Sequence, residues 1–256
     1  MRLPIVTQQH APQLLRKRLL VRPAGRSMTS PWLNIPLAEY EGHMSLPGIG
    51  QARMLSDHFA EILAEYSPGS VAVIGCAGGN GLDRIRPETT TRIVTIDINP
   101  DYLRVLASRF THRLPGLEPY VADVEVSLPA VEPVELVYAA LLFEYVAPAP
   151  TFRNLAVLCR PRGSLVTVVQ LPAGSLAPVS PSPYTSLNAL AAVMRLIAPE
   201  VLVRHAAEAG FVLSSTRQVV LPSGKRFLAQ VFSRSPDEHA PQATGVDGAT
   251  LAVAGA

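Results

Sequence analysis

Short apolar runs alternate with helical patterns along this chain, and this alternation constrains the fold more than any other feature of the sequence. Each run is bounded by polar or turn residues, and the four clearest cover residues 70–75, 92–97, 118–123 and 134–140. Apolar strands that alternate with helices favour a parallel sheet with helices on both faces. The sequence therefore predicts a three-layer, doubly wound α/β domain.

Helical patterns precede, separate and follow these runs. They cover residues 50–66, 81–90, 99–110 and 151–163. The pattern at 81–90 is short and weak, whereas that at 99–110 carries Pro100 in its first turn, where proline is favoured. The last pattern is followed by a β-branched run over 164–171, which predicts a further strand.

The C-terminal part departs from this alternation. After a helix predicted over 199–210, residues 211–221 and 225–234 form two strand patterns joined by the short turn "PSG". A mostly parallel sheet that closes with an antiparallel hairpin is a distinctive topology. Residues 172–186 are too rich in Pro and Ser for regular structure, which is typical of a lid or binding loop, and residues 186–197 predict a helix.

These patterns divide the chain into four segments. We expect a flexible basic extension over 1–30, a cap segment with a helix over 31–67, the main domain over 68–234 with a lid insertion at 172–198, and a disordered tail over 235–256. Six basic and no acidic side chains precede Glu39, so a targeting segment or a nucleic-acid tail stays an alternative for the extension. Met28 also offers a second start for the native chain.

The composition of the rest narrows the class of protein. The chain after residue 38 holds 16 basic against 20 acidic side chains, which is no electrostatic footprint for nucleic acid. No apolar run approaches the roughly 20 residues that span a bilayer. Cys76 and Cys159 are too few for a disulfide framework, and a reducing cytoplasm is the expected location. We expect no membrane partner and leave a homodimer open.

A glycine-rich loop follows the first run. In "VAVIGCAGGNG" (71–81), Ala77 and Asn80 occupy positions where a dinucleotide G-x-G-x-x-G loop has glycine. Asp97 lies 22 residues after Gly75, close to the spacing of an acid that binds ribose hydroxyls. The loop and this acid alone leave a nicotinamide cofactor, S-adenosylmethionine and a plain packing turn all open.

Further features favour S-adenosylmethionine. The loop has the spacing G-x-A-x-G, ending at Gly79, and a second acid, Asp123, ends the third run 26 residues after Asp97. An acid at that strand end can accept a hydrogen bond from an adenine amine. The closing hairpin also differs from the plain alternation of a dinucleotide domain.

Over residues 68–234 the chain resembles the class I S-adenosylmethionine-dependent methyltransferases. The resemblance rests on "VAVIGCAGGNG", "VTIDINP", "YVADVEVSLP", "VELVYAALLFEYV" and the "LCRPRGSLV" step, in this order. It implies a seven-stranded sheet with its last strand antiparallel, and S-adenosylmethionine as cofactor. The cofactor-binding residues that it implies are Gly75, Cys76, Ala77, Gly79, Asn80, Asp97, Ile98, Asp123, Val124 and Ala139.

The chain departs from the family pattern two positions before the first glycine. Family members often carry an acid there that helps to hold the cofactor's amino group, and this chain has Val73. Backbone carbonyls of the loop or Glu144 are the expected substitutes. Ala77 in place of glycine adds only a methyl group, which the loop tolerates if the backbone φ of Ala77 is negative.

The acceptor is expected to be a small organic molecule. The segment "ALLFEYV" lacks the N-P-P-Y or D-P-P-Y signature of amino-methylating nucleic-acid enzymes, and it lacks Pro-Cys. A nicotinamide-dependent oxidoreductase and a non-catalytic, cofactor-binding regulatory module stay as alternatives. The expected catalytic residues are His43, Glu144 and Tyr145, and the expected substrate-pocket residues are Trp32, Tyr40, Glu41 and Tyr184. The histidines form no ligand spacing, so no metal is predicted.

Overall fold

The computed structural model describes residues 30–174 and 176–236. The predicted basic extension, apart from Ser30, and the predicted tail from residue 237 onward lie outside the described residues. No helix in the described part of the chain is both long and apolar enough to cross a membrane.

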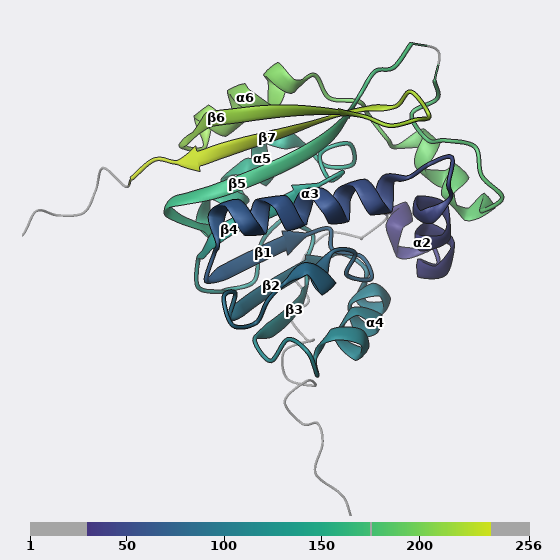
Figure 1. Cartoon of the computed structure of the whole chain (residues 1–256). Helices are drawn as coiled ribbons and strands as arrows, with labels where there is room; N and C mark the ends of the chain where they lie inside the picture. The colour runs from purple at the N-terminus through teal and green to yellow at the C-terminus, as the bar shows by residue number, and fades with distance from the viewer. Residues whose placement is uncertain (1–29, 175, 237–256) are drawn as a thin grey trace, which may run out of the picture.

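A seven-stranded sheet forms the centre of the molecule (Figure 1). Its order is β3-β2-β1-β4-β5-β7-β6, and only β7 runs antiparallel to its neighbours. The strands are β1 (Ser70–Ile74), β2 (Arg92–Asp97), β3 (Leu117–Val121), β4 (Val134–Ala140), β5 (Cys159–Leu171), β6 (Phe211–Val220) and β7 (Arg226–Arg234). The predicted doubly wound, mostly parallel sheet with its closing hairpin is confirmed.

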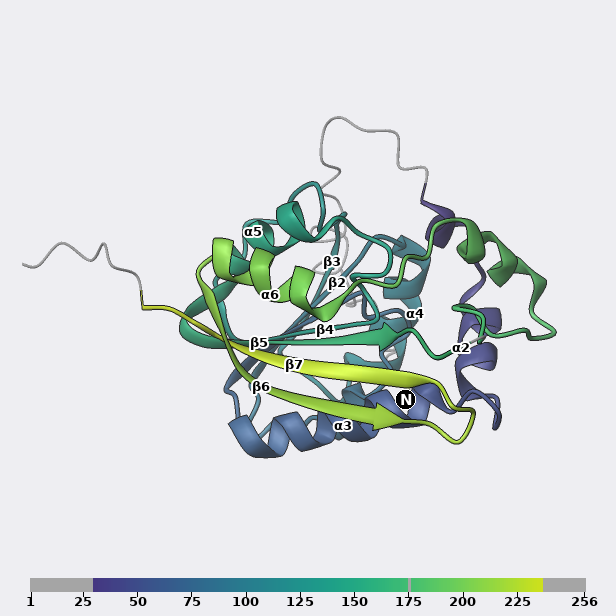
Figure 2. The same cartoon turned by 90° about the horizontal axis from the view of Figure 1, so that it is seen from above.

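Helices cover both faces of this sheet. They are α2 (Leu37–Ser45), α3 (Gln51–Tyr66), α4 (Pro100–Phe110), α5 (Pro148–Leu158) and α6 (Pro199–Glu208), with the short 3-10 helices η1 (Pro31–Leu33), η2 (Leu82–Arg84) and η3 (Thr185–Ala192). Figure 2 shows α3 on one face and α5 with α6 on the other. Figures 1 and 2 also place α2 beside the 185–192 segment, at one end of the sheet.

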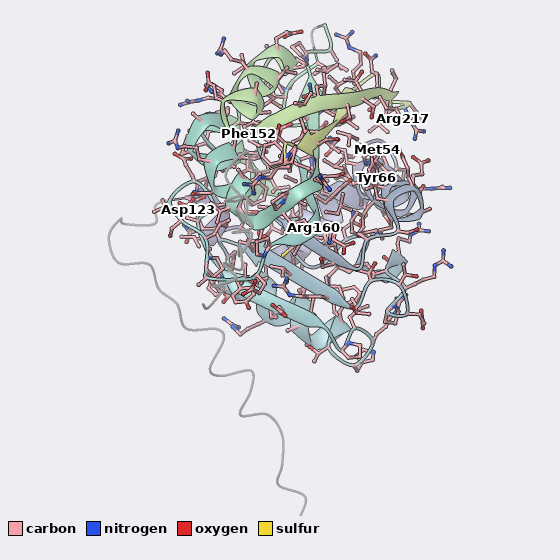
Figure 3. All side chains as sticks on the ribbon, turned by 90° about the vertical axis from the view of Figure 1, so that its left-hand side faces the viewer. Met54, Tyr66, Asp123, Phe152, Arg160 and Arg217 are labelled. Atoms are coloured by element: carbon pink, nitrogen blue, oxygen red, sulfur yellow. The ribbon has the colours of Figure 1, made fainter. Side chains whose placement is uncertain are left out.

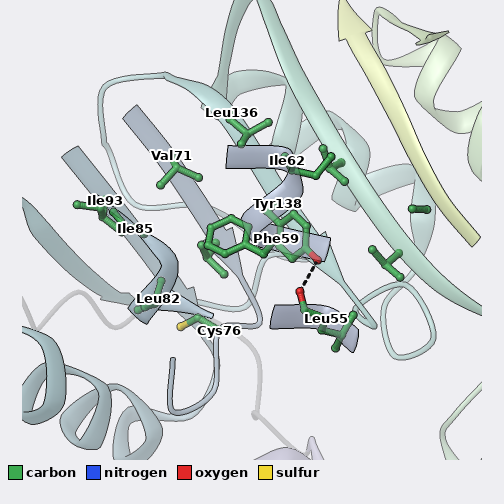
Figure 4. Packing of buried hydrophobic residues seen from close by; sticks show 14 of the residues in the cluster. Leu55, Phe59, Ile62, Val71, Cys76, Leu82, Ile85, Ile93, Leu136 and Tyr138 are labelled. Atoms are coloured by element: carbon green, nitrogen blue, oxygen red, sulfur yellow. Dashed lines mark hydrogen bonds between the residues drawn. The ribbon is translucent and has the colours of Figure 1, made fainter. Parts of the chain in front are cut away.

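Each face has its own apolar core. On the α3 face, Phe59 packs on Tyr138 of β4 with ring centroids 4.7 Å apart, and the Tyr138 hydroxyl donates to the Leu55 carbonyl at 3.5 Å (Figure 4). On the opposite face, Phe152 of α5 stacks on Phe143, also at 4.7 Å. Figure 3 shows Phe152 and Tyr66 on opposite sides of the sheet. The inner strands β1, β2 and β4 are therefore buried on both sides, which accounts for their almost uninterrupted apolar runs, whereas the edge strand β6 is mostly exposed.

Three helix predictions were wrong in extent. The pattern at 81–90 yields only η2, because Gly81 adopts a left-handed φ of +86° and Pro87 lacks the N–H that a longer helix needs. The helix predicted over 151–163 ends at Leu158, because β5 begins to pair with β4 at Cys159. The helix predicted over 186–197 is the shorter η3, whose buried Leu187 and Leu190 share one face at 3-10 spacing.

The start of β5 contains an irregularity that explains the second of these differences. Cys159 pairs with Val134, whereas Ser164 pairs with Leu136, so the intervening residues bulge out of the sheet. Arg162 has a φ of +62° within this bulge. The "CRPRG" segment, which the sequence resemblance places between a helix and a strand, is thus part of β5 itself.

Gly116, just before β3, offers a test of this packing. A Cβ at this position would lie 1.8 Å from the Thr91 carbonyl oxygen, and that oxygen belongs to the backbone. We expect Gly116→Ala to lower the free energy of unfolding by about 2–3 kcal/mol, because the start of β3 would have to move away from β2. Denaturant unfolding measures the change.

Gly48→Ala is the matched control for this prediction. No atom lies within 4 Å of a Cβ built at Gly48, so its effect should stay within about 0.5 kcal/mol. Equal effects of the two substitutions would contradict the close approach of β3 to Thr91.

Candidate functional site

A cavity of about 630 Å³, here called the main cavity, lies where β1, β2, β3 and β4 end. Ligands of doubly wound sheets bind in this position, outside the carboxyl ends of the parallel strands. The residues that line it are Ser30, Pro31, Trp32, Tyr40, Gly75, Ala77, Ile96, Asp97, Ile98, Tyr102, Ala122, Asp123, Val124, Glu125, Val126, Ala140, Leu141, Leu142, Tyr145, Val146 and Val193.

Asp97, at the end of β2, is one of the acids that line this cavity. Its Oδ2 accepts the Ala77 N–H at 2.8 Å and its Oδ1 accepts the Asn99 N–H at 2.9 Å. Burial raises the pKa of Asp97 to about 6, and the backbone N–H groups of Asn99 and Ala77 oppose that rise. A carboxylate has about four acceptor positions, so Asp97 retains capacity for further donors from the cavity.

The glycine loop is held in an unusual backbone conformation. Gly75 and Gly79 have φ values of +66° and +91°, and Ala77 between them has +44°. The condition under which alanine is tolerated without strain, a negative φ at Ala77, is therefore not met. An L-residue in this region costs roughly 1–2 kcal/mol, and the hydrogen bond from Ala77 to Asp97 helps to hold it there.

Asp123 also lines the main cavity and lies shortly after the end of β3. It is half-buried, its Oδ1 accepts the Glu125 N–H at 3.0 Å, and the buried Val124 lies next to it. Figure 3 shows Asp123 at the side of the molecule away from Arg217. An acidic and an apolar side chain thus stand together where the third strand ends.

Three aromatic side chains form another wall. Trp32 makes edge contacts with Tyr40 at 5.4 Å and with Tyr145 at 5.0 Å between ring centroids. The Trp32 carbonyl accepts from the Asn99 side chain at 2.8 Å, and the Tyr102 hydroxyl donates to the Ile35 carbonyl at 2.7 Å. These bonds tie the segment around η1 to the start of α4.

A second, smaller cavity of about 50 Å³ adjoins the first and is here called the side cavity. Trp32, Tyr40, Leu141 and Tyr145 line both cavities. The other residues that line the side cavity are His43, Met44, Gln51, Gln170, Pro178, Val179, Ser180, Leu187, Leu190, Met194 and Lys225. It lies between α2, η3 and the ends of β5 and β7.

Comparison of the whole sequence with known families and with curated proteins yields no match. Solved structures do match its fold. The N-methyltransferase NodS from Bradyrhizobium japonicum WM9, in complex with S-adenosyl-L-homocysteine, has a TM-score of 0.55 at 16% identity, over 75% of this chain and 90% of NodS. Magnesium protoporphyrin IX methyltransferase (ChlM) from Synechocystis PCC 6803, with bound SAH, has a TM-score of 0.55 at 13% identity, over 73% of this chain and 84% of ChlM.

The same arrangement is found in the [4+2]-cyclase SpnF, with a TM-score of 0.56 at 15% identity, over 70% of this chain and 81% of SpnF. The strand order and the reversed β7 agree with the topology implied by the sequence resemblance. This chain has the class I S-adenosylmethionine-dependent methyltransferase fold. At these identities the likeness concerns the fold.

Within this class I fold, many of the residues predicted for the site line the two cavities. Those that line the main cavity are Gly75, Ala77, Asp97, Ile98, Asp123, Val124, Trp32, Tyr40 and Tyr145. His43 lines the side cavity.

Other predicted cofactor residues lie away from the cavities. Cys76 and Ala139 are buried in the two apolar cores, and Val73 packs in the same core as Cys76. The Asn80 side chain donates to the Ala52 carbonyl at 2.9 Å. A Cβ on Gly79 would meet the Phe110 ring at 2.7 Å, so this glycine allows the loop to pack against α4.

Two predicted substrate-pocket residues also lie outside both linings. Glu41 accepts two hydrogen bonds from Arg109, at 2.5 and 3.0 Å, and Arg109 also donates to the Gly78 carbonyl at 3.1 Å. Tyr184 packs with Ile35 near η3. Glu41 thus connects α2 to the glycine loop through Arg109.

Some lining residues escaped the sequence prediction. Leu141 and Leu142 directly follow β4, and their position at a parallel strand end could have indicated them. Lys225, in the turn before β7, carried no signal, since only tertiary packing brings that turn to the side cavity. Within residues 30–174 and 176–236, no group of three His, Cys, Asp or Glu side chains could hold a metal ion.

Glu144 is fully buried and lines neither cavity. Its Oε1 accepts the Gln170 N–H at 2.6 Å, and its Oε2 has no hydrogen-bond partner among the described residues. Burial raises the pKa of Glu144 from 4.5 to about 7, and the Gln170 N–H opposes this rise.

The buried Glu144 predicts a pH-dependent stability. Between pH 4.5 and 7 the folded protein keeps a proton on Glu144 that the unfolded chain releases, so the free energy of unfolding should fall as the pH rises. The contribution is complete below pH 4.5 and amounts to about 3 kcal/mol at most. Glu144→Gln should remove it, as urea unfolding at several pH values will measure.

Asp97 provides the internal control for that experiment. The contribution of Asp97 to stability is lost as the pH rises through about 6, which is below the pKa of Glu144. This part of the pH dependence should persist in the Glu144→Gln variant. An unchanged pH dependence near pH 7 in the variant would contradict a buried, proton-binding Glu144.

Proposed function

We propose that this protein is an S-adenosylmethionine-dependent methyltransferase that acts on a small organic acceptor. The observation that carries the proposal is the position of Asp97 and Asp123 on one cavity, beside the backbone of the glycine loop, in a sheet of the class I fold. The cavity of about 630 Å³ has the size of small-molecule and cofactor sites.

The residues of the main cavity fit this cofactor. In the proposed arrangement, Asp97 accepts from the ribose hydroxyls, Asp123 and Val124 contact the adenine, and the backbone at Gly75 and Ala77 faces the methionine part. The free acceptor positions on Asp97 support the first of these contacts. Val73 lies in the core, so backbone carbonyls are the proposed partners of the amino group.

The cofactor, when bound, supplies an activated methyl group on a sulfonium. The protein then has to align the acceptor and exclude water, and alignment by itself can contribute about 7–11 kcal/mol. We propose that the cap segment 31–67 and the insertion 172–198 align the acceptor and exclude water, since residues of both segments line the side cavity. The hydrogen bonds from Ser186 to Glu39, at 2.6 and 3.3 Å, join the two segments.

His43 is the best-placed proton acceptor of the three predicted catalytic residues. It lines the side cavity, and its buried Nδ1 has no partner among the described residues. Burial and the charge of Lys225 lower the pKa of His43, which keeps the imidazole neutral near pH 7. Burial raises the pKa of Tyr145 above its ordinary range, so its phenol stays protonated at neutral pH and can donate a hydrogen bond but cannot act as a base.

The other functional alternatives are separated by ligand binding. A nicotinamide-dependent oxidoreductase would bind NAD, and a regulatory module would bind S-adenosylmethionine without methyl transfer. The fold of SpnF, a [4+2]-cyclase, is a reason to measure transfer directly. We propose a cytoplasmic protein with no nucleic-acid or membrane partner and leave a homodimer to sedimentation analysis.

Calorimetry and a transfer assay test the proposal. We expect S-adenosylhomocysteine to bind and NAD not to bind. Labelled S-adenosylmethionine, incubated with a panel of small organic acids, amines and phenols, should yield labelled product. Absence of heat with S-adenosylhomocysteine would refute the cofactor assignment, whereas binding without any product would favour the regulatory module.

Asp97→Ala gives the sharpest mutational prediction. The substitution should weaken S-adenosylhomocysteine binding by about 1–3 kcal/mol, because a charged acceptor of hydrogen bonds is lost. The affinity is measured by calorimetry, together with a thermal melt that reports whether the glycine loop still folds.

Asp83→Asn serves as control for the removal of a carboxylate. Asp83 lies in η2, its side chain is 57% exposed, and it lines neither cavity. The Asp83→Asn variant should bind S-adenosylhomocysteine with the same affinity as the unaltered protein. Equal affinities in Asp97→Ala and Asp83→Asn would show that the ribose assignment is wrong.

A further inference from the structure

Lys225 is a buried cation at the wall of the side cavity. Only 4% of its surface is exposed, and its Nζ donates to the Pro178 carbonyl at 2.6 Å and to the Gln170 side chain at 3.4 Å. Both acceptors are neutral. Among the described residues, no carboxylate forms an ion pair with it.

Such an arrangement is costly for the protein by itself. A buried ammonium group loses its hydration, and uncharged acceptors replace only part of it. Burial accordingly lowers the pKa of Lys225 to about 8. A negatively charged ligand group in the side cavity would supply the missing counter-charge.

The lining of the side cavity suits an anion. It includes no Asp or Glu, and the only charged or titratable groups that accompany Lys225 are His43, Tyr40 and Tyr145. The buried Nδ1 of His43 has no partner among the described residues, and Gln51 and Gln170 are also buried there. Glu144, the acid whose carboxyl accepts the Gln170 N–H, does not line the cavity.

The size of the cavity limits the anion. A water molecule needs at least about 10–15 Å³ of such space, so a cavity of about 50 Å³ has room for a few heavy atoms. A carboxylate fits this size, whereas a phosphate monoester is larger. The aromatic walls of Trp32, Tyr40 and Tyr145 continue from this cavity into the main cavity.

We propose that the acceptor is an apolar or aromatic carboxylic acid, bound with its carboxylate on Lys225 in the side cavity and its body between Trp32, Tyr40 and Tyr145. This proposal rests on the proposed function, because the main cavity is then the cofactor's. The carboxylate is a binding handle. The methylated atom lies on the body of the acceptor, which extends toward the main cavity.

Fluorescence of Trp32, the only tryptophan of the chain, provides the test. The full-length protein is titrated with benzoate and phenylacetate and with their neutral amides, benzamide and phenylacetamide, with and without S-adenosylhomocysteine. We expect the acids to bind about tenfold or more tightly than the amides, the usual range for a hydrogen bond to a charged group.

Lys225→Met should abolish the preference for the acids. Arg226→Met is the matched control, since Arg226 is the next residue but is exposed and lines neither cavity, and it should keep the preference. Lys225→Gln gives a second neutral variant. Removal of an unpaired buried charge should raise the melting temperature of the Lys225→Met variant above that of the unaltered protein. If Lys225 had a purely structural role, the substitution would lower the melting temperature instead.

The outcomes separate the two proposals. Equal binding of acids and amides, no binding of either acid, or a preference that survives in both Lys225 variants would overturn the carboxylate handle, whatever S-adenosylhomocysteine does. Failure of S-adenosylhomocysteine to bind, with the acid preference intact, would instead refute the cofactor assignment and leave the anion site standing.

Discussion

The carboxylate of Asp97 connects the segments on which the rest of the site depends. One oxygen accepts the Ala77 N–H and the other accepts the Asn99 N–H, so a single side chain joins the glycine loop to the segment between β2 and α4. Asn99 in turn caps α4 through its contact with the Asp101 N–H at 2.9 Å, and it holds the Trp32 carbonyl. This chain of bonds fixes three walls of the main cavity relative to one another.

The two cavities have opposite electrostatic character. The main cavity contains Asp97 and Asp123, whereas the side cavity contains Lys225 and His43 and no acid. In the proposed function, this division matches the ligands, because the cofactor carries a positive sulfonium and hydroxyl donors, and the acceptor carries a carboxylate. The aromatic side chains shared by both cavities separate the two sets of charges.

Much of the fold follows from local patterns. The apolar runs and the hairpin turn predicted the sheet, because a strand buried on both faces needs continuous apolar sequence and a tight turn needs particular residues. The extents of the helices were less predictable. Leu158 ends α5 because β5 pairs early with β4, and that pairing depends on residues distant in sequence. The left-handed φ of Ala77 is likewise stabilised by Asp97, from the neighbouring strand.

The sequence by itself determined the alternation of elements, the glycine loop and the two acids at strand ends. Each of these follows from the spacing of residues within one element or its adjoining turn. Only the tertiary structure decided which side chains meet in the side cavity. His43, Gln170 and Lys225 come from α2, β5 and the turn before β7, and no periodicity relates them. Their proximity results from the packing of α2 and the 172–198 segment over the end of the sheet. This packing buries the Lys225 ammonium group beside neutral acceptors alone.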